Sequence, residues 1–67
     1  MKNTVKVERA KNDFTQAQLA EKVKVSRQTI NAIESGDYNL STVLALKIAA
    51  VFHTTVDAIF ELEEKDW

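Results

Sequence analysis

The sequence predicts one compact all-α domain, residues 1–67, built from five short helices. Three observations carry this prediction. A residue able to cap a helix N-terminus precedes each of five apolar runs, the apolar residues in those runs recur at helical spacing, and the chain has no Pro and one Gly. Because so short a chain buries only about 60% of its unfolded surface, helix packing and dimerisation are expected to support its core.

The first two helices are expected at about residues 4–11 and 16–23. Asn3 can cap the first. Thr15 opens the second with Thr-Gln-Ala-Gln, a capping-box pattern that places Gln18 at the third helical position. Three apolar side chains of the second helix share one face: Leu19, Ala20 and Val23.

The third helix is expected at about residues 27–35. Ser26 can cap its N-terminus, and Gly36 follows its end, where a left-handed backbone conformation favours Gly. Ile30 and Ile33 share the face that should meet the core. The opposite face is then left to polar side chains with forked hydrogen-bonding groups.

The fourth helix, about 42–53, begins after Ser41 and is apolar over most of its circumference. A helix of that kind in so small a domain is predicted to be the central one. Thr55 can cap a short fifth helix at about 56–60. The alternation from Phe60 to Glu63 is a weak strand signal.

Composition narrows the function classes. The absence of Cys removes disulfides, iron–sulfur clusters and thiolate zinc, and a single His among scattered acids leaves no metal-ligand cluster, so no metal or cofactor is expected. No apolar run approaches the roughly 18 residues of a membrane span, and no signal peptide opens the chain. We therefore expect a soluble, cytoplasmic protein with no membrane partner.

The charge is unevenly distributed along the chain. The net charge is −1, but residues 1–27 carry +4 (seven basic, three acidic) and residues 28–67 carry −5 (two basic, seven acidic). A binding face responds to the local potential, so this asymmetry is compatible with a nucleic-acid partner for the first half. The acidic tail would repel phosphates and should face away from them.

The helices at 16–23 and 27–35, joined by residues 24–26, have the layout of a helix-turn-helix. The run from Phe14 to Gly36, FTQAQLAEKVKVSRQTINAIESG, resembles the helix-turn-helix of the lambda-repressor/Cro or xenobiotic-response-element type. With YNLS at 38–41, ALKIA at 45–49 and Ile59-Phe60, the resemblance covers nearly the whole chain. The opening Met-Lys-Asn and the short tail are similar to those of a subgroup of very small regulators that includes the cytolysin repressor.

The resemblance implies a five-helix DNA-binding fold, dimerisation and binding to a two-fold-related operator. It also implies roles for particular residues. Base-contacting positions are matched by Arg27, Gln28 and Asn31; contacts to the DNA backbone by Gln16, Tyr38 and Asn39; and a structural ion pair by Arg9 and Glu34. We also expect Thr29 to contact a base and Ser26 to contact the DNA backbone. By analogy with the subgroup, Met1–Asn3 are expected to pair with residues 60–63 as a short β-ribbon.

The side chains of the third helix suit base reading. Arg27 has two parallel donors that match guanine O6 and N7, whereas Gln28 and Asn31 each have a donor and an acceptor that match adenine N6 and N7. Thr29 could meet a thymine methyl or a phosphate. Taken alone, the same pattern is also that of a solvated helix face, and Tyr38 could equally be a packing residue.

Four positions depart from the family pattern. Where the family commonly has Gly, this chain has Asp13, Lys24 and His53, and where many relatives have Pro it has Leu40. If the three backbones are left-handed, each non-Gly residue costs roughly 1 kcal/mol. None of these sites is expected to touch a base.

We expect dimer contacts on the side away from DNA, at Val56, Ile59, Phe60 and Leu62. Trp67 is either part of a frayed chain end or covers this dimer interface. The sequence thus indicates a homodimeric, sequence-specific regulator of double-stranded DNA, a repressor rather than an activator, binding an inverted-repeat operator and showing no small-molecule site. The alternative is an antitoxin or anti-regulator with a protein partner. Enzymatic activity is the least expected function, since the sequence shows no nucleophile–base pair and no phosphate-binding loop.

Overall fold

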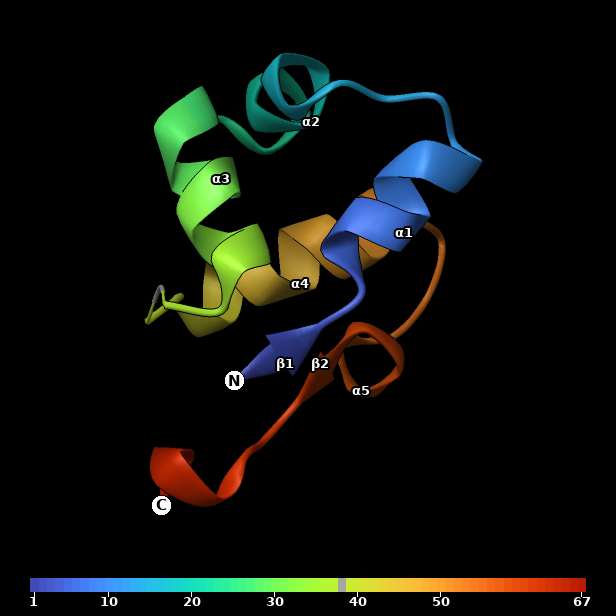
Figure 1. Cartoon of the computed structure of the whole chain (residues 1–67). Helices are drawn as coiled ribbons and strands as arrows, with labels where there is room; N and C mark the ends of the chain where they lie inside the picture. Colours follow the sequence, from blue (N-terminus) through green and yellow to red (C-terminus); the bar gives the residue numbers. More distant parts are fainter. Residues whose placement is uncertain (38) are drawn as a thin grey trace.

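A computed structural model describes residues 1–37 and 39–67. Within them, five α-helices confirm the predicted order, and a two-stranded ribbon and a terminal 3-10 turn complete the fold (Figure 1). The elements are β1 (Lys2–Asn3), α1 (Val5–Lys11), α2 (Gln16–Val23), α3 (Arg27–Ser35), α4 (Thr42–Val51), α5 (Val56–Ile59), β2 (Phe60–Glu61) and η1 (Glu64–Asp66).

Side-chain caps set the starts of α2, α3, α4 and α5. The predicted capping box is present, because Thr15 Oγ1 accepts from Gln18 N–H at 3.0 Å and Gln18 Oε1 accepts from Thr15 N–H at 2.8 Å. Hydroxyl oxygens of three further residues accept from the backbone N–H three positions on: Ser26, Ser41 and Thr55. Each pattern therefore satisfies one N–H that the helix itself leaves unpaired.

Three boundaries differ from the expectation. α1 begins at Val5 after Thr4, and Asn3 accepts from Val5 N–H at 3.2 Å without being the cap residue. α4 ends at Val51 instead of 53, since His53 has a φ of 55° that no α-helix continues. α5 ends at Ile59 because Phe60 turns to extended backbone and enters β2.

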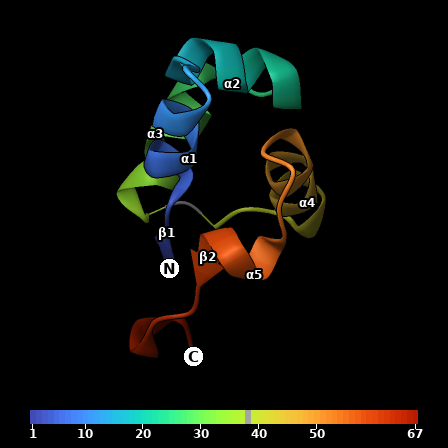
Figure 2. The same cartoon turned by 90° about the vertical axis from the view of Figure 1, so that its right-hand side faces the viewer.

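α4 is not buried all round, which corrects the prediction of a central helix. One of its faces is in the core, through Leu44, Ala45, Ile48 and Ala49. On the other, Val43 and Leu46 are 64% and 56% exposed. Figure 2 shows the reason: α1 and α3 lie on one side of the molecule, α2 crosses its top, and α4 forms the opposite margin. Only one face of α4 therefore has helices to pack against.

The two ends of the described chain meet in the expected ribbon. β1 and β2 pair antiparallel, with Lys2 opposite Glu61 and Asn3 opposite Phe60. The ribbon is shorter than predicted, ending before Leu62. It lies beside α5, and both termini are at this end of the molecule in Figures 1 and 2.

The positions where the family commonly has Gly are left-handed here. The φ values are 56° at Asp13, 62° at Lys24 and 55° at His53, which confirms the conformation on which the expected cost depends. Gly36 has a φ of 85° and ends α3. An added Cβ at Gly36 would lie 3.2 Å from the carbonyl oxygen of Met1, so both backbone and packing favour Gly there.

Candidate nucleic-acid interface

The burial of two isoleucines orients α3. Ile30 and Ile33 are buried in the core, while Arg27, Gln28 and Asn31 are exposed. Thr29 is half-buried. The structure thus places three of the four predicted base-contacting residues on solvent-facing positions of one short helix. An exposed guanidinium beside two exposed amides supplies the donors and acceptors that major-groove edges require.

The N-terminus of α3 is a closed hydrogen-bonded turn. Ser26 Oγ accepts from Thr29 N–H at 3.1 Å and lies 3.0 Å from Thr29 Oγ1. The two hydroxyls are therefore engaged with each other in the free protein. A contact from either to DNA would share or exchange this hydrogen bond, and the roles of Ser26 and Thr29 stay predictions.

An ion pair joins α1 to α3. Arg9 Nε donates to Glu34 Oε2 at 2.7 Å, and Arg9 Nη2 donates to Glu34 Oε1 at 3.2 Å. Arg9 Nη1 also donates to the carbonyl of Phe14 at 2.9 Å. The guanidinium thus anchors α1, the α1–α2 turn and α3 at one point, in the forked geometry that only Arg provides.

The charge state of this pair follows from its surroundings. Burial of Glu34 disfavours its ionised form, but hydrogen bonds from Arg9 and Gln16 and the charges of Arg9 and Lys6 outweigh it and lower the pKa of the carboxyl. The hydrogen bond to Glu34 raises the pKa of Arg9. Both groups are therefore charged near neutral pH.

Gln16 connects this pair to the predicted base-reading face. Its Nε2 lies 3.1 Å from Glu34 Oε1 and 3.2 Å from Asn31 Oδ1. The sequence resemblance indicates a contact to the DNA backbone for Gln16 but not these two partners. One sequence pattern could have indicated that Gln16 contacts both residues: Asn31 and Glu34 are three apart and so share a face of α3.

Asn3 is a contact that the sequence reasoning missed. Its Nδ2 donates to the carbonyl of Ile33 at 2.7 Å, while its Oδ1 accepts from Val5 N–H. One half-buried amide therefore links β1, the start of α1 and the last turn of α3. No local pattern indicates this link, because it spans 30 residues.

The remaining predicted contacts to the DNA backbone lie after α3. Asn39 is exposed, as that role requires. Tyr38 lies outside the described residues. Several basic side chains of the first half are also exposed: Lys6, Lys11, Lys22 and Lys24. Two of them have neighbours within the chain, since Lys11 Nζ is 3.3 Å from Glu8 Oε2 and Lys22 Nζ lies 4.9 Å from the ring centroid of Phe14.

The predicted dimer contacts are only partly on the surface. Ile59 and Phe60 are 3% and 8% exposed, because α5 and β2 pack these side chains into the core of one chain. They have little surface left for a second chain, and the expected set of dimer contacts stays a prediction. Val56 is half-buried and Leu62 is 57% exposed. Val43 and Leu46 of α4, absent from the expected set, are exposed apolar side chains as well.

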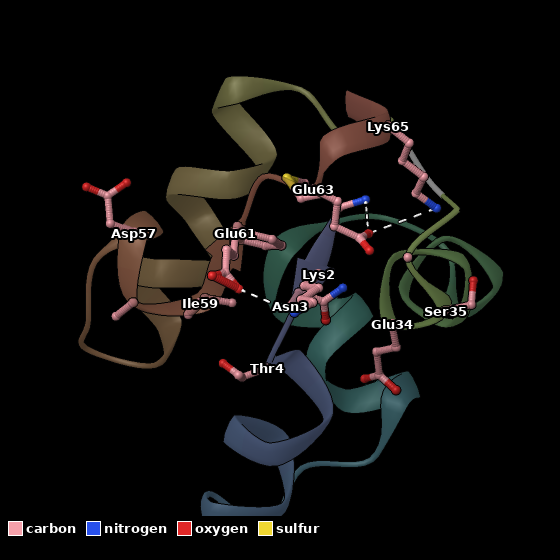
Figure 3. Close-up of a pocket in the computed structure, with 14 residues that line it drawn as sticks. Lys2, Asn3, Thr4, Glu34, Ser35, Asp57, Ile59, Glu61, Glu63 and Lys65 are labelled. Atoms are coloured by element: carbon pink, nitrogen blue, oxygen red, sulfur yellow. Dashed lines mark ion pairs between the residues drawn. The ribbon is translucent and has the colours of Figure 1, made fainter. Parts of the chain in front are cut away.

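A hollow of about 740 Å³ lies between the ribbon, α5 and the end of α3 (Figure 3). Its charged side chains include pairs: Lys65 Nζ is 4.0 Å from Glu63 Oε1, and Lys2 Nζ is 3.9 Å from Glu61 Oε1. In Figure 3 the carboxylate of Glu34 points away from these pairs. Among the described residues, no group of three His, Cys, Asp or Glu is placed to hold a metal ion.

Residues 1–37 and 39–67 contain no helix long and apolar enough to span a bilayer.

Comparison with solved structures supports the fold. The chain superposes on the clp gene regulator ClgR of Corynebacterium glutamicum with a TM-score of 0.73 and 24% identity, over 79% of this chain and 56% of that one. It superposes on a chain of the SinR protein/SinI protein complex with a TM-score of 0.77 and 23% identity, over 94% and 62%. At these identities the likeness concerns architecture.

Comparison of sequences is more specific. The Helix-turn-helix family model matches residues 5–59. An uncharacterised HTH-type transcriptional regulator of Bacillus subtilis is 48% identical over 66 residues, covering 98% of this chain and 100% of the relative. One from Methanocaldococcus jannaschii has the same identity and coverage. The chain therefore belongs to the XRE-type helix-turn-helix family, whose members are DNA-binding transcriptional regulators.

Proposed function

We propose that this chain is a homodimeric, sequence-specific repressor that binds an inverted-repeat operator with α3 in the major groove. The observation that carries the proposal is the division of α3 into two faces. Ile30 and Ile33 hold the helix to the core, and Arg27, Gln28 and Asn31 are exposed beside them. A helix fixed in this way presents its forked side chains without large rearrangement, as major-groove reading requires.

The backbone contacts in this proposal come from the ends of two helices. Gln16 is the first residue of α2, whose unpaired N–H groups favour a phosphate, and Asn39 follows α3. Phosphate contacts would position α3 and release counterions on binding, so affinity should fall steeply as salt rises. The acidic residues of the C-terminal segment favour an orientation that keeps that segment away from the duplex.

Dimerisation is proposed through the exposed apolar surface of α4 with Val56 and Leu62. Leu46 and Val56 both line two hollows, of about 360 and 380 Å³. A second copy could insert its own Leu46 into one of them, giving a self-complementary two-fold contact. An inverted repeat requires the two copies of α3 to lie about 34 Å apart, one turn of duplex, and the proposed dimer has to meet this spacing.

Selection of bound sequences from a random duplex pool at physiological salt tests DNA recognition. We expect an enriched inverted repeat whose half-sites are about 10 base pairs apart, centre to centre. Enrichment without two-fold symmetry would contradict the dimeric mode, and no enrichment would contradict sequence-specific binding. A reporter gene placed behind the enriched site distinguishes repression from activation.

Sedimentation analysis of the Leu46→Ser variant tests whether the chain dimerises through the α4 surface. We expect the dimer dissociation constant to rise at least about tenfold, since a buried leucine contributes roughly 2 kcal/mol. Val7→Ser is a matched control, because Val7 is 52% exposed on α1. If both changes have the same effect, or if neither has an effect, the α4 surface is not the dimer interface.

A protein partner is the second candidate function. The SinR neighbour was solved in a complex with the SinI protein, and the exposed side chains Val43 and Leu46 offer an apolar contact surface on this chain as well. In this alternative, the α4 surface binds a different protein and the chain acts as an antitoxin or anti-regulator. A chain that is monomeric alone and co-purifies stoichiometrically with the product of a neighbouring gene would favour it.

A further inference from the structure

Three polar side chains form a chain of hydrogen bonds that ends on the face of α3. Glu34 Oε1 accepts from Gln16 Nε2 at 3.1 Å, and Asn31 Oδ1 accepts from the same nitrogen at 3.2 Å. We propose that Glu34, acting through Gln16, fixes the amide orientation of Asn31, so that Asn31 presents its NH₂ group to the base it reads. This inference rests on the proposed function and adds a specificity rule to it.

The first step concerns the orientation of Gln16. An amide oxygen and nitrogen have nearly the same shape, so hydrogen-bond partners must decide which is which. An ionised carboxylate only accepts hydrogen bonds, and Glu34 is held ionised by the guanidinium of Arg9 at 2.7 Å. The atom of Gln16 that faces Glu34 must therefore be its nitrogen, because an oxygen there would be repelled.

The second step passes this orientation to Asn31. The NH₂ group of Gln16 has two hydrogens; one is used by Glu34 and the other points to Asn31. The Asn31 atom that faces it must be the oxygen. Its nitrogen then points outward, and no described residue accepts a hydrogen bond from Asn31 Nδ2. The ion pair of Arg9 with Glu34, near the C-terminal end of α3, thus determines that the NH₂ group of the exposed Asn31 amide faces outward.

The third step is the consequence for reading. A side-chain amide that is free to rotate can offer either its accepting oxygen or its donating NH₂ group to a base edge. With its oxygen held by Gln16, Asn31 offers a donor, which requires an acceptor such as guanine N7 or O6, adenine N7 or thymine O4. Cytosine presents only the N4 amino donor in the major groove, so it should be rejected on the contacted strand. Gln16 and Glu34 are accordingly positioning residues for the specificity of Asn31.

Random-pool selection with three variants tests this rule. Asn31→Ala first identifies the base-pair position that Asn31 reads, as the one where discrimination is lost. Asn31→Asp keeps an oxygen for Gln16 and replaces the outward donor with an acceptor, so the preference at that position should move toward cytosine, about tenfold. Gln16→Met leaves the Arg9–Glu34 pair intact and removes the connection, so discrimination should weaken at that position alone.

Gln18→Met is the matched control. Gln18 also lies on α2, but its side chain accepts from Thr15 N–H and has no hydrogen bond to a described residue of α3. Its selected motif should match that of the wild type, and melting curves of all variants verify folding. A uniform loss of affinity in Gln16→Met would show a phosphate contact, whereas the ratio between bases at one position reports the orientation of Asn31.

The outcomes separate the two proposals. If the wild type enriches no sequence, the proposed function fails. If the wild type enriches a motif, the function stands; the orientation rule then fails if Gln16→Met keeps the full discrimination and Asn31→Asp shows no shift toward cytosine. A shift to cytosine with relaxed discrimination in Gln16→Met supports the rule.

Discussion

Arg9 Nε lies 2.7 Å from Glu34 Oε2, and this one contact joins the first helix to the helix predicted to read DNA. The side chains of Arg9 and Glu34 are 17% and 7% exposed. A pair so shielded differs from the exposed pair of Lys11 and Glu8, 3.3 Å apart within α1. Its loss should therefore affect both stability and the placement of α3.

Glu34→Ala should lower the free energy of unfolding by about 3–5 kcal/mol, because it leaves the guanidinium of Arg9 half-buried without its carboxylate. Urea unfolding followed by circular dichroism measures the change. Glu8→Ala, which removes an exposed pair, should cost about 1 kcal/mol or less. A near-neutral result for Glu34→Ala would show that the pair contributes little.

The same pair predicts a pH dependence. The pKa of Glu34 in the folded chain is below its ordinary value of 4.5, so the unfolded chain takes up this proton first as pH falls. The stabilisation is complete above about pH 4.5 and is lost as pH decreases through the lower, folded pKa. Unfolding titrations should show wild-type stability converging on that of Glu34→Gln as acid is added; a constant gap would contradict this.

Lys24→Gly should raise the melting temperature. Lys24 ends α2 with a φ of 62°, and relieving this left-handed conformation should gain about 1 kcal/mol. For a domain of this size that corresponds to about 4–8 °C in a calorimetric scan. Lys22→Gly, inside α2, should instead lower the melting temperature by a comparable amount. An unchanged or lower value for Lys24→Gly would mean that its side chain makes a compensating contact.

Arg27→Ala should cost about 1–3 kcal/mol of operator binding and relax the preference at one base pair, if Arg27 reads a guanine as proposed. Titration of labelled duplexes that differ only at that pair measures both effects. Lys47→Ala removes an exposed positive charge from α4 and should weaken all duplexes slightly and equally. An equal loss on every duplex for Arg27→Ala would identify Arg27 as a phosphate contact.

Local sequence patterns predicted most of the fold. The starts of α2 to α5 follow from hydroxyl caps, whose partners are only three residues away, and Gly36 marks the end of α3 for an equally local reason. Ile30 and Ile33 predicted the buried face of α3 through helical spacing alone. These features need no knowledge of the rest of the chain.

The family resemblance added what spacing could not indicate. It predicted the pairing of Arg9 with Glu34, which are 25 residues apart, and the pairing of the chain ends as a ribbon. It did not distinguish the surface residues of α5 and β2 from the buried ones: Ile59 and Phe60, expected to contact a second chain, are 3% and 8% exposed. The likeness to the cytolysin repressor, finer than the family, stays a prediction.

The sequence by itself determined the order of the helices, the caps of α2 to α5 and the polar character of the exposed face of α3, because each depends on residues within a turn or two of one another. Only the tertiary structure decided that α4 leaves Val43 and Leu46 exposed, that Asn3 holds the last turn of α3, and that Gln16 joins Glu34 to Asn31. Those contacts depend on how the helices pack against one another. An amide has no preferred orientation until packing supplies the charge beside it.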